Sequence, residues 1–403
     1  MGTGTRYRVY LTPKVNLETY GDEIEISDYV RVDNVGQIVR SIDSSDYDIG
    51  VFTYADITLS CHNAKGLFND PNDSRSLFIY SRDLAKIRVV FERENASSIT
   101  FRGLIADEAS RVIPETDDIE FKVLGRDSAL RKAQVPSGTV TDGMTFTQAL
   151  NAVLNSQEVT RVLGFDAGNI MPAYDGTVGS GAEFNGRSKK DAVDELLLAA
   201  NSIMLLDEDD FMVVQSRAHD SLKEPLQLYG PGDLRGRENV VSLPEYNIGL
   251  NRVFNSVKVN NTVISDVTSV NTYGLRRKEI SLNWITDPVV EAAIAQALVS
   301  EFRYPKIELQ VEIATSIAKD YGLLDRVSLD YPLLIQPSGS RLPISGFAIS
   351  GDEDTPTPYF SGSIVIDPNV AFKIIEISED PNSFNTVLKL RQTGTGTSDG
   401  SFT

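Results

Sequence analysis

The chain has 403 residues, of which 41% are hydrophobic, so it is long and apolar enough for two or three globular domains and is not a disordered chain. Its 57 acidic residues outnumber 38 Lys and Arg and give a net charge of -19, which disfavours a nucleic-acid-binding protein because the chain repels phosphates. Its single cysteine, Cys61, excludes an intrachain disulfide and a cysteine-based zinc or iron–sulfur site built from one chain.

From residue 6 to about 130 the hydrophobic pattern has mostly a period of two, which predicts antiparallel strands. Apolar and polar residues alternate at 57–60, 87–92 and 119–123, so one face of each strand is expected to be buried and the other to meet water or a partner. Residues 69–74 combine Asn, Asp, Pro and Ser and predict a turn. They lack the central Gly and terminal Glu of an EF-hand, so a turn is preferred to a calcium site.

Between about 131 and 235 the period becomes helical in two places, which marks a distinct module. Thr145 is a predicted N-cap for a helix with one apolar side, and Gln148 lies in its first turn. Ser188 and Asp191 predict a capping-box-like start for a second helix, which ends near Asn201. The apolar sides carry Phe146, Leu150, Val153 and Leu154 in the first helix and Ala192, Leu196 and Ala200 in the second.

Four acidic residues, 207–210, lie between apolar runs at 203–206 and 211–214, and this pattern predicts a hairpin. Four carboxylates in a row could hold a metal ion, but no His occurs nearby before His219. Because carboxylates at a hairpin tip are ordinarily a solvated turn, the turn is the preferred interpretation.

From about 236 to 392 strands return, interrupted by one helix. Asp287 is its predicted N-cap and Pro288 its first residue, and an apolar stripe follows from Val290 to the stop at Tyr304 and Pro305. An alternating strand with one wet face is predicted at 307–313, and residues 393–403 are expected to be a flexible tail. Further strands are predicted at 327–329, 364–366, 372–377 and 387–390. The whole chain is therefore expected to be an α+β, mainly β protein.

The chain has only two histidines for base catalysis, His62 and His219. His62 directly follows Cys61, so on a strand their side chains point to opposite faces and form no local Cys–His pair. The sequence contains no Gly-x-Ser-x-Gly elbow, no His-Glu-x-x-His and no phosphate-binding loop. No enzyme activity, catalytic residue, metal or cofactor is predicted, although a glycosidase needs only two carboxylates and stays open.

Several segments, in their order along the chain, resemble the central hub proteins of phage tails. This family includes the baseplate hubs of contractile tails and their relatives in siphophages and gene transfer agents. The resemblance covers about residues 120–392 and extends to the first 120 residues only by strand content. The segments that carry it are 123–127, 145–150, 196–200 with the following hairpin, 251–259, 269–274, 287–305 and 321–329. Tip proteins of some flexible-tailed phages have a cysteine-rich segment, which this chain cannot have.

The resemblance implies two related β-barrel domains with an inserted small α+β domain. The expected boundaries are 1–130 for the first hub barrel, 131–235 for the inserted domain, 236–392 for the second barrel and 393–403 for the tail. It further implies a homotrimer whose six barrels form a six-fold-like ring, which adapts a hexameric tail tube to a three-fold tip. Such a hub is a structural protein with no substrate.

The partners implied by the resemblance are further copies of this chain, the distal tail or tail tube protein, the tape-measure protein, and tip, spike or fibre proteins. DNA passes through the ring without specific binding. The location implied is the virion, at the tail tip or baseplate, after assembly in the bacterial cytoplasm. The first residues lack the apolar segment of a signal peptide and no stretch approaches the roughly 18 to 20 apolar residues of a membrane span, so we expect a soluble protein that is not exported by the usual route.

The negative charge has a specific use in such a ring, because carboxylates lining the channel keep DNA from adhering during passage. The candidate channel-lining residues lie near strands or in loops that link them: Asp117, Asp118, Asp352, Glu353 and Asp354. Solubility is the alternative explanation of the charge, and ordinary solvated loops are the alternative for these five residues.

Two other functions stay open at this stage. One is a receptor- or glycan-binding tail accessory protein, and the other is a cell-wall glycoside hydrolase. The lone tryptophan, Trp284, argues against the glycan binder because sugars usually stack on exposed Trp and Tyr, although the 15 tyrosines weaken that argument.

Overall fold

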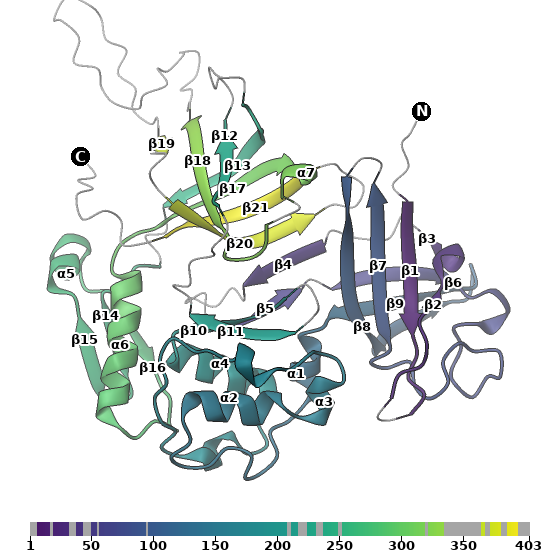
Figure 1. Ribbon diagram of the computed structural model, residues 1–403, viewed down its shortest axis with the longest axis horizontal. Helices are drawn as coiled ribbons and strands as arrows, with labels where there is room; N and C mark the ends of the chain where they lie inside the picture. Colours follow the sequence, from purple (N-terminus) through teal and green to yellow (C-terminus); the bar gives the residue numbers. More distant parts are fainter. Residues whose placement is uncertain are drawn as a thin grey trace, which may run out of the picture. The chain divides into compact units, whose positions relative to one another are not determined.

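The computed structural model of the chain describes residues 6–16, 19–31, 38–42, 50–54, 56–93, 96–207, 211–216, 224–230, 237–248, 252–318, 321–333, 364–366, 371–379 and 385–393 (Figure 1). The chain divides into two compact units. Unit 1 comprises Met1–His219, Asn251–Tyr304 and Ser378–Phe384. Unit 2 comprises Asp220–Leu250, Pro305–Ile377 and Asn385–Thr403.

A seven-stranded antiparallel sheet in unit 1 has the order β2-β1-β7-β8-β9-β6-β3. The predicted runs at 57–60, 87–92 and 119–123 are confirmed as parts of β6, β7 and β9. The pairing of β8 with β9 shifts register between Ala106 and Arg111, and such bulges bend a strand. The strands are β1 (Arg6–Thr12), β2 (Ile24–Glu25), β3 (Val30–Arg31), β6 (Ile57–His62), β7 (Lys86–Arg93), β8 (Ala96–Ile113) and β9 (Asp118–Gly125).

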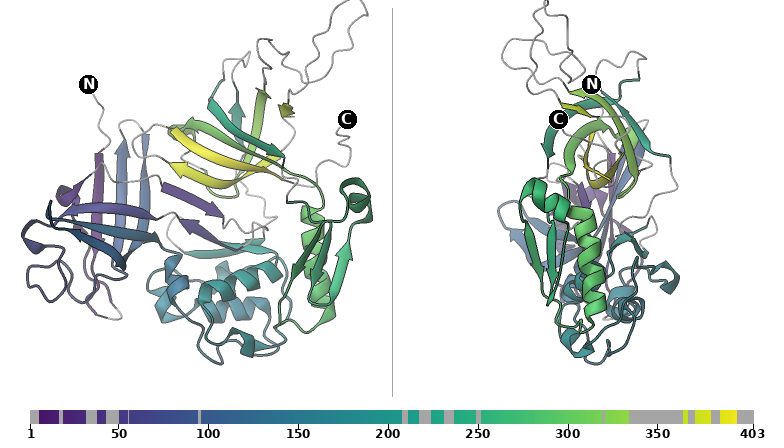
Figure 2. Two further views of the ribbon diagram at one scale, coloured as in Figure 1. Left: turned by 180° about the vertical axis from the view of Figure 1, so that it is seen from behind. Right: turned by 90° about the vertical axis from the view of Figure 1, so that its left-hand side faces the viewer.

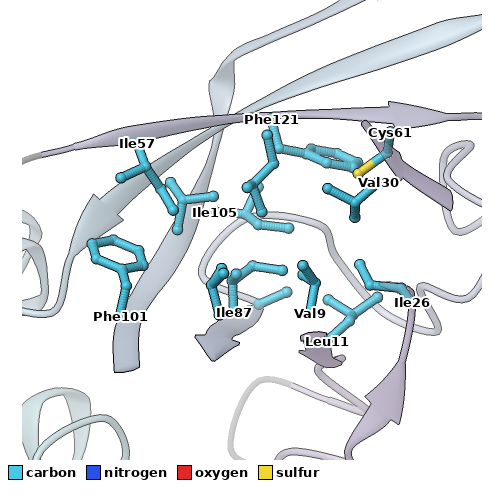
Figure 3. Close-up of a cluster of buried hydrophobic side chains, with 14 of the residues drawn as sticks. Val9, Leu11, Ile26, Val30, Ile57, Cys61, Ile87, Phe101, Ile105 and Phe121 are labelled. Carbon is cyan, nitrogen blue, oxygen red and sulfur yellow. The ribbon is translucent and has the colours of Figure 1, made fainter. Parts of the chain in front are cut away.

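The period-two alternation of these strands gathers their apolar side chains on one face of the curled sheet (Figure 3). Phe121 is at the centre of this core, and its ring lies edge-on to Phe68 and Phe78 with centroids 5.8 and 5.9 Å away. Cys61 points into the same core, and burial raises the pKa of its thiol to about 12. Other members include Val9, Leu11, Ile57, Ile87, Val89, Phe101 and Ile105.

Two short strands, β4 (Ile38–Ile42) and β5 (Gly50–Tyr54), lie between β3 and β6 in the sequence but do not belong to this seven-stranded sheet. They pair with each other, and β5 pairs in parallel with β10 (Ser202–Leu206) of a later segment. β10 forms the predicted hairpin with β11 (Met212–Ser216). Strands far apart in the sequence therefore make one sheet beside the helices of this segment (Figure 2).

The helical segment of unit 1 begins where sequence capping signals predict it. Thr145 accepts from the Gln148 N–H, and Gln148 reaches back to the Thr145 N–H, so the capping box at the start of α2 is complete. Ser188 likewise accepts from the Asp191 N–H at the start of α4. The helices are α1 (Ser128–Lys132), α2 (Phe146–Leu154), α3 (Gln157–Thr160) and α4 (Lys189–Ala199), with short 3-10 turns at Ala167–Asn169 and Gly181–Phe184.

A third segment of unit 1 packs the long helix α6 (Pro288–Phe302) against a three-stranded sheet of order β15-β14-β16. As predicted, Asp287 caps α6 by accepting from the Val289 N–H, and Pro288 is its first residue. The α6 residue Glu291 is buried but satisfied, because it accepts hydrogen bonds from Asn260 and Thr262. The other elements are β14 (Ser256–Val259), β15 (Thr262–Ser265), α5 (Val267–Tyr273) and β16 (Arg277–Ile280).

Unit 2 contains a second curled sheet, in which β18 pairs with β12, β19 and β20, and β20 continues through β21 and β17 to β13. The alternation predicted at 307–313 is confirmed in β17, where every second residue from Ile307 to Ile313 is buried. The elements are β12 (Leu226–Tyr229), β13 (Val240–Ile248), β17 (Ile307–Ala314), α7 (Thr315–Ala318), β18 (Arg326–Leu333), β19 (Ile364–Ile366), β20 (Ala371–Glu379) and β21 (Asn385–Gln392).

The two curled sheets share one strand order. In the first, six strands follow the order β1-β7-β8-β9-β6-β3, and in the second six follow β12-β18-β20-β21-β17-β13. When the six strands of each sheet are numbered in chain order, neighbouring strands across either sheet follow the order first, fourth, fifth, sixth, third, second. They differ at one edge, because β1 is antiparallel to β7 whereas β12 is parallel to β18. The predicted α+β, mainly β fold with two related β modules is confirmed, and each module is a curled half-barrel.

Among the described residues, no helix has the length and apolar character needed to cross a bilayer.

Replacing Phe121 with Ala is expected to lower the free energy of unfolding by about 3–5 kcal/mol, because it removes a fully buried ring from the centre of the first core. Urea unfolding followed by circular dichroism measures this. The matched control is Val112→Ala on β8, whose side chain is exposed, and its effect should stay within about 0.5 kcal/mol. Equal losses in the two variants would contradict this assignment of the core.

Candidate assembly surfaces

The outward face of the first sheet carries a row of cations, which we call the arginine row: Arg8, Arg88 and Arg102. The strand register places Arg88 of β7 beside both Tyr10 of β1 and Arg102 of β8. The Arg88 guanidinium lies 4.0 Å from the centre of the Tyr10 ring. Arg8 is exposed on β1. The row thus sets three arginines on one sheet face of a chain whose net charge is -19.

Arg88 of this row is held in place by Glu23. Its Nε donates to one carboxylate oxygen at 2.9 Å and its Nη2 to the other at 2.5 Å, a bidentate pairing. These hydrogen bonds hold the pKa of Glu23 below its usual value and raise that of Arg88. The ring contact and the carboxylate together restrict the long Arg88 side chain to one position.

The outward face of the second sheet is built from mixed-charge ladders. Arg391 of β21 donates to Glu308 of β17 at 2.9 Å through Nε and at 2.5 Å through Nη2. Gln310 donates to Glu245 at 2.7 Å, across the pairing of β17 with β13. Burial lowers the pKa of Arg391 to about 10. The two modules share a strand order but differ in the charge pairs on the faces opposite their cores, and the Arg391–Glu308 pair is itself largely buried.

Two of the predicted channel-lining residues lie where the turn after β8 enters β9: Asp117 ends the turn and Asp118 begins β9. Asp117 is exposed and has a φ of 52°, a left-handed conformation that Asp tolerates, and its carbonyl accepts from the Asn63 N–H. Asp118, by contrast, is only 3% exposed, and His62 Nδ1 lies 3.3 Å from its carboxylate. Within this chain Asp117 offers a carboxylate to solvent and Asp118 does not.

The remaining predicted residues of interest fall outside the described part of the chain. These are Asp352, Glu353 and Asp354 of the channel set, His219, and the predicted tail after residue 393. Of the five candidates, the described part of the chain contains Asp117 and Asp118, which are neighbours at the start of β9.

In each of the two acidic clusters considered as metal sites, a described carboxylate accepts internal hydrogen bonds. Asp207 accepts from the Phe211 N–H at 2.8 Å, closing the hairpin between β10 and β11. In the 69–74 turn, the Asp73 carboxylate accepts from Asn69 and Arg75, and these bonds lower its pKa. Within the described residues there is no group of three or more His, Cys, Asp or Glu side chains placed to hold a metal ion.

The one tryptophan has a structural role. Trp284 is 1% exposed, its ring packs against Phe146 and Phe184, and its Nε1 donates to Glu195 at 2.9 Å. Glu195 is itself paired with Arg187. Trp284 therefore joins the α2–α4 segment to the segment that ends in α6, and it cannot serve as an exposed platform for a sugar ring.

The arginine row is not among the features predicted from the sequence, although part of its signal is present there. The alternation in β7 places Arg88 on the face opposite Ile87 and Val89, so its outward position follows from period two. Its neighbours do not follow, because Arg8 and Arg102 lie on separate strands whose register is not visible in the sequence.

Three solved structures share this fold over nearly the whole chain. The tail protein from Neisseria meningitidis MC58 matches with a TM-score of 0.53 and 13% identity, over 96% of this chain and 96% of that one. The 43 kDa tail protein of prophage MuSo2 from Shewanella oneidensis matches at 0.51 and 14% identity, over 96% and 98%. The prophage tail protein gp18 from Listeria monocytogenes EGD-e matches at 0.51 and 10% identity, over 96% and 95%.

Neither a family model nor a curated protein matches the sequence. The three structural matches show that the chain has the fold of these phage tail proteins, as the order of its sequence segments predicted.

Replacing Asp118 with Asn should lower the free energy of unfolding by about 1–3 kcal/mol, because an amide donor replaces a buried acceptor that faces His62. The adjacent Asp117→Asn is the matched control. Its side chain is exposed and Asn also tolerates a left-handed φ, so its effect should stay within about 0.5 kcal/mol. Urea unfolding at neutral pH compares the two, and a larger loss for Asp117→Asn would refute the placement of these carboxylates.

Proposed function

We propose that this chain is a non-enzymatic hub subunit of a phage tail tip or baseplate. In this proposal three copies form a ring that adapts a six-fold tail tube to a three-fold tip and surrounds the channel for DNA ejection. The observation that supports it best is the strand order shared by the two half-barrels of one chain. The similarity of the fold to phage tail proteins over 96% of the chain supports a location in a phage tail.

The duplication matters because symmetric closed rings are made from equivalent building blocks. A chain with two half-barrels of one topology supplies two such blocks, so three chains supply six. A ring of this kind presents six similar modules to a hexameric tube and three identical chains to a trimeric tip.

The proposed domain division places the two half-barrels at 1–130 and 236–392, with 131–235 inserted between them. The helices α2 to α4 and the β10–β11 hairpin lie within the inserted part, and α1 spans its first boundary. Strand β12, Leu226–Tyr229, lies near the end of the range 131–235 but pairs with β18 of the second half-barrel.

The proposed partners are further copies of this chain, the distal tail or tail tube protein, the tape-measure protein and the tip, spike or fibre proteins. A cytoplasmic assembly stage followed by incorporation at the tail tip is part of the same proposal. The competing role of a glycan-binding accessory protein loses its best aromatic candidate, because Trp284 is buried.

The purified chain is expected to form a trimer with three times the 44.3 kDa chain mass, visible as rings with a central hole in negative stain. Mass photometry over a concentration series, with and without the phage's own tail tube protein, measures the oligomer. Because hub proteins can stay monomeric until partners arrive, the sample with tail tube protein is decisive. A monomer or dimer in that sample would refute the ring.

Neutralising four of the candidate carboxylates in the phage should slow DNA release without blocking particle assembly, because DNA then adheres more strongly to the channel. The variant is Asp117→Asn with Asp352→Asn, Glu353→Gln and Asp354→Asn. The control neutralises Glu183 and Glu279 in other segments. Dye-detected DNA release from purified particles exposed to receptor measures the rate. An unchanged rate of DNA release by the variant with four substitutions would show that these residues do not line the channel.

A further inference from the structure

A pocket of about 270 Å³ in unit 1 lies between the residues that follow β1, the residues that precede β7, and helices α1 and α3. Lys14 is one of its lining residues. The apolar part of the lining is formed by Leu84, Ala129, Ala133 and Val162. A lysine amine beside an apolar surface in a small pocket is an arrangement that suits a covalent bond to a carbonyl compound.

The position of Lys14 leaves its amine open to a small solute. A backbone bridge to Tyr20 holds Lys14 beside the pocket, and its side chain is partly exposed. The ammonium group has no hydrogen bond or ion pair with any residue that the structure describes. No described carboxylate therefore holds the Lys14 nitrogen in its charged form by direct contact.

The charges around Lys14 favour its neutral form. Burial is the main cause that lowers the pKa of its ammonium group, and Asp83 acts in the opposite direction. The Asp83 carboxylate, however, lies 2.8 Å from Lys132 Nζ. Arg161 and Lys132 line the same pocket, and their positive charges lower the Lys14 pKa further. More of the Lys14 amine is thus neutral at a given pH than that of an ordinary exposed lysine.

The other titratable groups at the pocket do not offset this effect. Tyr20 is uncharged, because burial raises the pKa of its hydroxyl to about 12. Glu158 lines the pocket and lies 3.9 Å from the ammonium of the buried Lys189. The Lys86 ammonium lies over the Tyr20 ring, 4.3 Å from its centre.

We infer that this pocket is a covalent binding site for a small neutral aldehyde, which Lys14 holds as an imine. The neutral amine nitrogen forms a bond to the carbonyl carbon, and the carbon–oxygen bond then breaks. The oxygen leaves as water with the two hydrogens of the amine, so no oxidant or reductant is needed. The aliphatic part of the aldehyde packs on the apolar lining, and a neutral reactant is not repelled by a chain of net charge -19.

Imine formation at Lys14 goes beyond the proposed ring and does not depend on it, because every group involved belongs to unit 1 of one chain.

The test treats the purified full chain with propanal and cyanoborohydride and measures the labelling of each lysine by peptide mass spectrometry. Cyanoborohydride delivers a hydride to the imine carbon and leaves a stable propylamine. At about pH 7, Lys14 should be labelled at least about threefold faster than Lys258, because more of its amine is neutral. Lys258 is the matched control, since it is also partly exposed but its ammonium lies 3.9 Å from the Glu279 carboxylate.

The pH dependence separates the reactivity of Lys14 from its exposure. The ratio of the Lys14 rate to the Lys258 rate should fall towards one as the pH rises to about 11, where both amines are neutral. Burial also lowers the pKa of Lys189, but this side chain is 1% exposed, so it should stay unlabelled.

Two substitutions test the site itself, after thermal unfolding has shown that each variant is folded. Lys14→Arg keeps the charge but forms no imine under these conditions, so the fast label should be lost. Lys132→Gln should slow the labelling of Lys14 by at least about twofold, because it removes a nearby cation and frees Asp83 to stabilise the Lys14 ammonium.

Three outcomes would overturn the inference: equal rates for Lys14 and Lys258 at about pH 7, a ratio of rates that does not change with pH, or unchanged Lys14 labelling in the folded Lys132→Gln variant. Because the assay needs no oligomer, its failure leaves the ring proposal untouched.

Discussion

Both half-barrels depend on one constraint: strands that are distant in the sequence must pair so that every second side chain enters a common core. In the first sheet β6 pairs with β9 in the register that sets Leu59 against Phe121, and in the second β17 pairs with β21 so that Leu309 meets Leu390. A slip of one residue in either pairing would turn the apolar set outward. The core therefore specifies the register, and the register determines which charges meet on the outward face.

The shared strand order also explains where the extra segments occur. In each sheet the second and third of the six strands, β3 and β6 or β13 and β17, lie together at one edge. The sequence between these two strands contains extra elements, β4 and β5 in the first sheet and β14 to α6 in the second. An edge loop can be lengthened at small entropic cost and without breaking the central pairs. Two modules with the same order and the same point of interruption are most simply explained as a duplicated unit with different insertions.

Local signals in the sequence predicted much of this structure, whereas long-range pairing could not be predicted. The caps at Thr145, Ser188 and Asp287 and the alternation in β7 and β17 are properties of a few adjacent residues. The parallel pairing of β5 with β10 joins residues about 150 positions apart, and no local pattern records it. The same limit applies to the site residues, since period two places Arg88 outward, but its pairing with Glu23 requires the tertiary fold.

The two half-barrels are alike in topology and unlike in their charge pairs, and the proposed adaptor would use this difference. On the first sheet Arg88 pairs with Glu23 and lies against the Tyr10 ring, whereas on the second Arg391 pairs with Glu308. In the proposed ring, six modules of one shape would carry two alternating sets of charges. Shape complementarity would then serve a six-fold partner, while charge, which governs the specificity of docking, would repeat only three times. One duplicated chain can thus present six-fold geometry to one neighbour and three-fold chemistry to another.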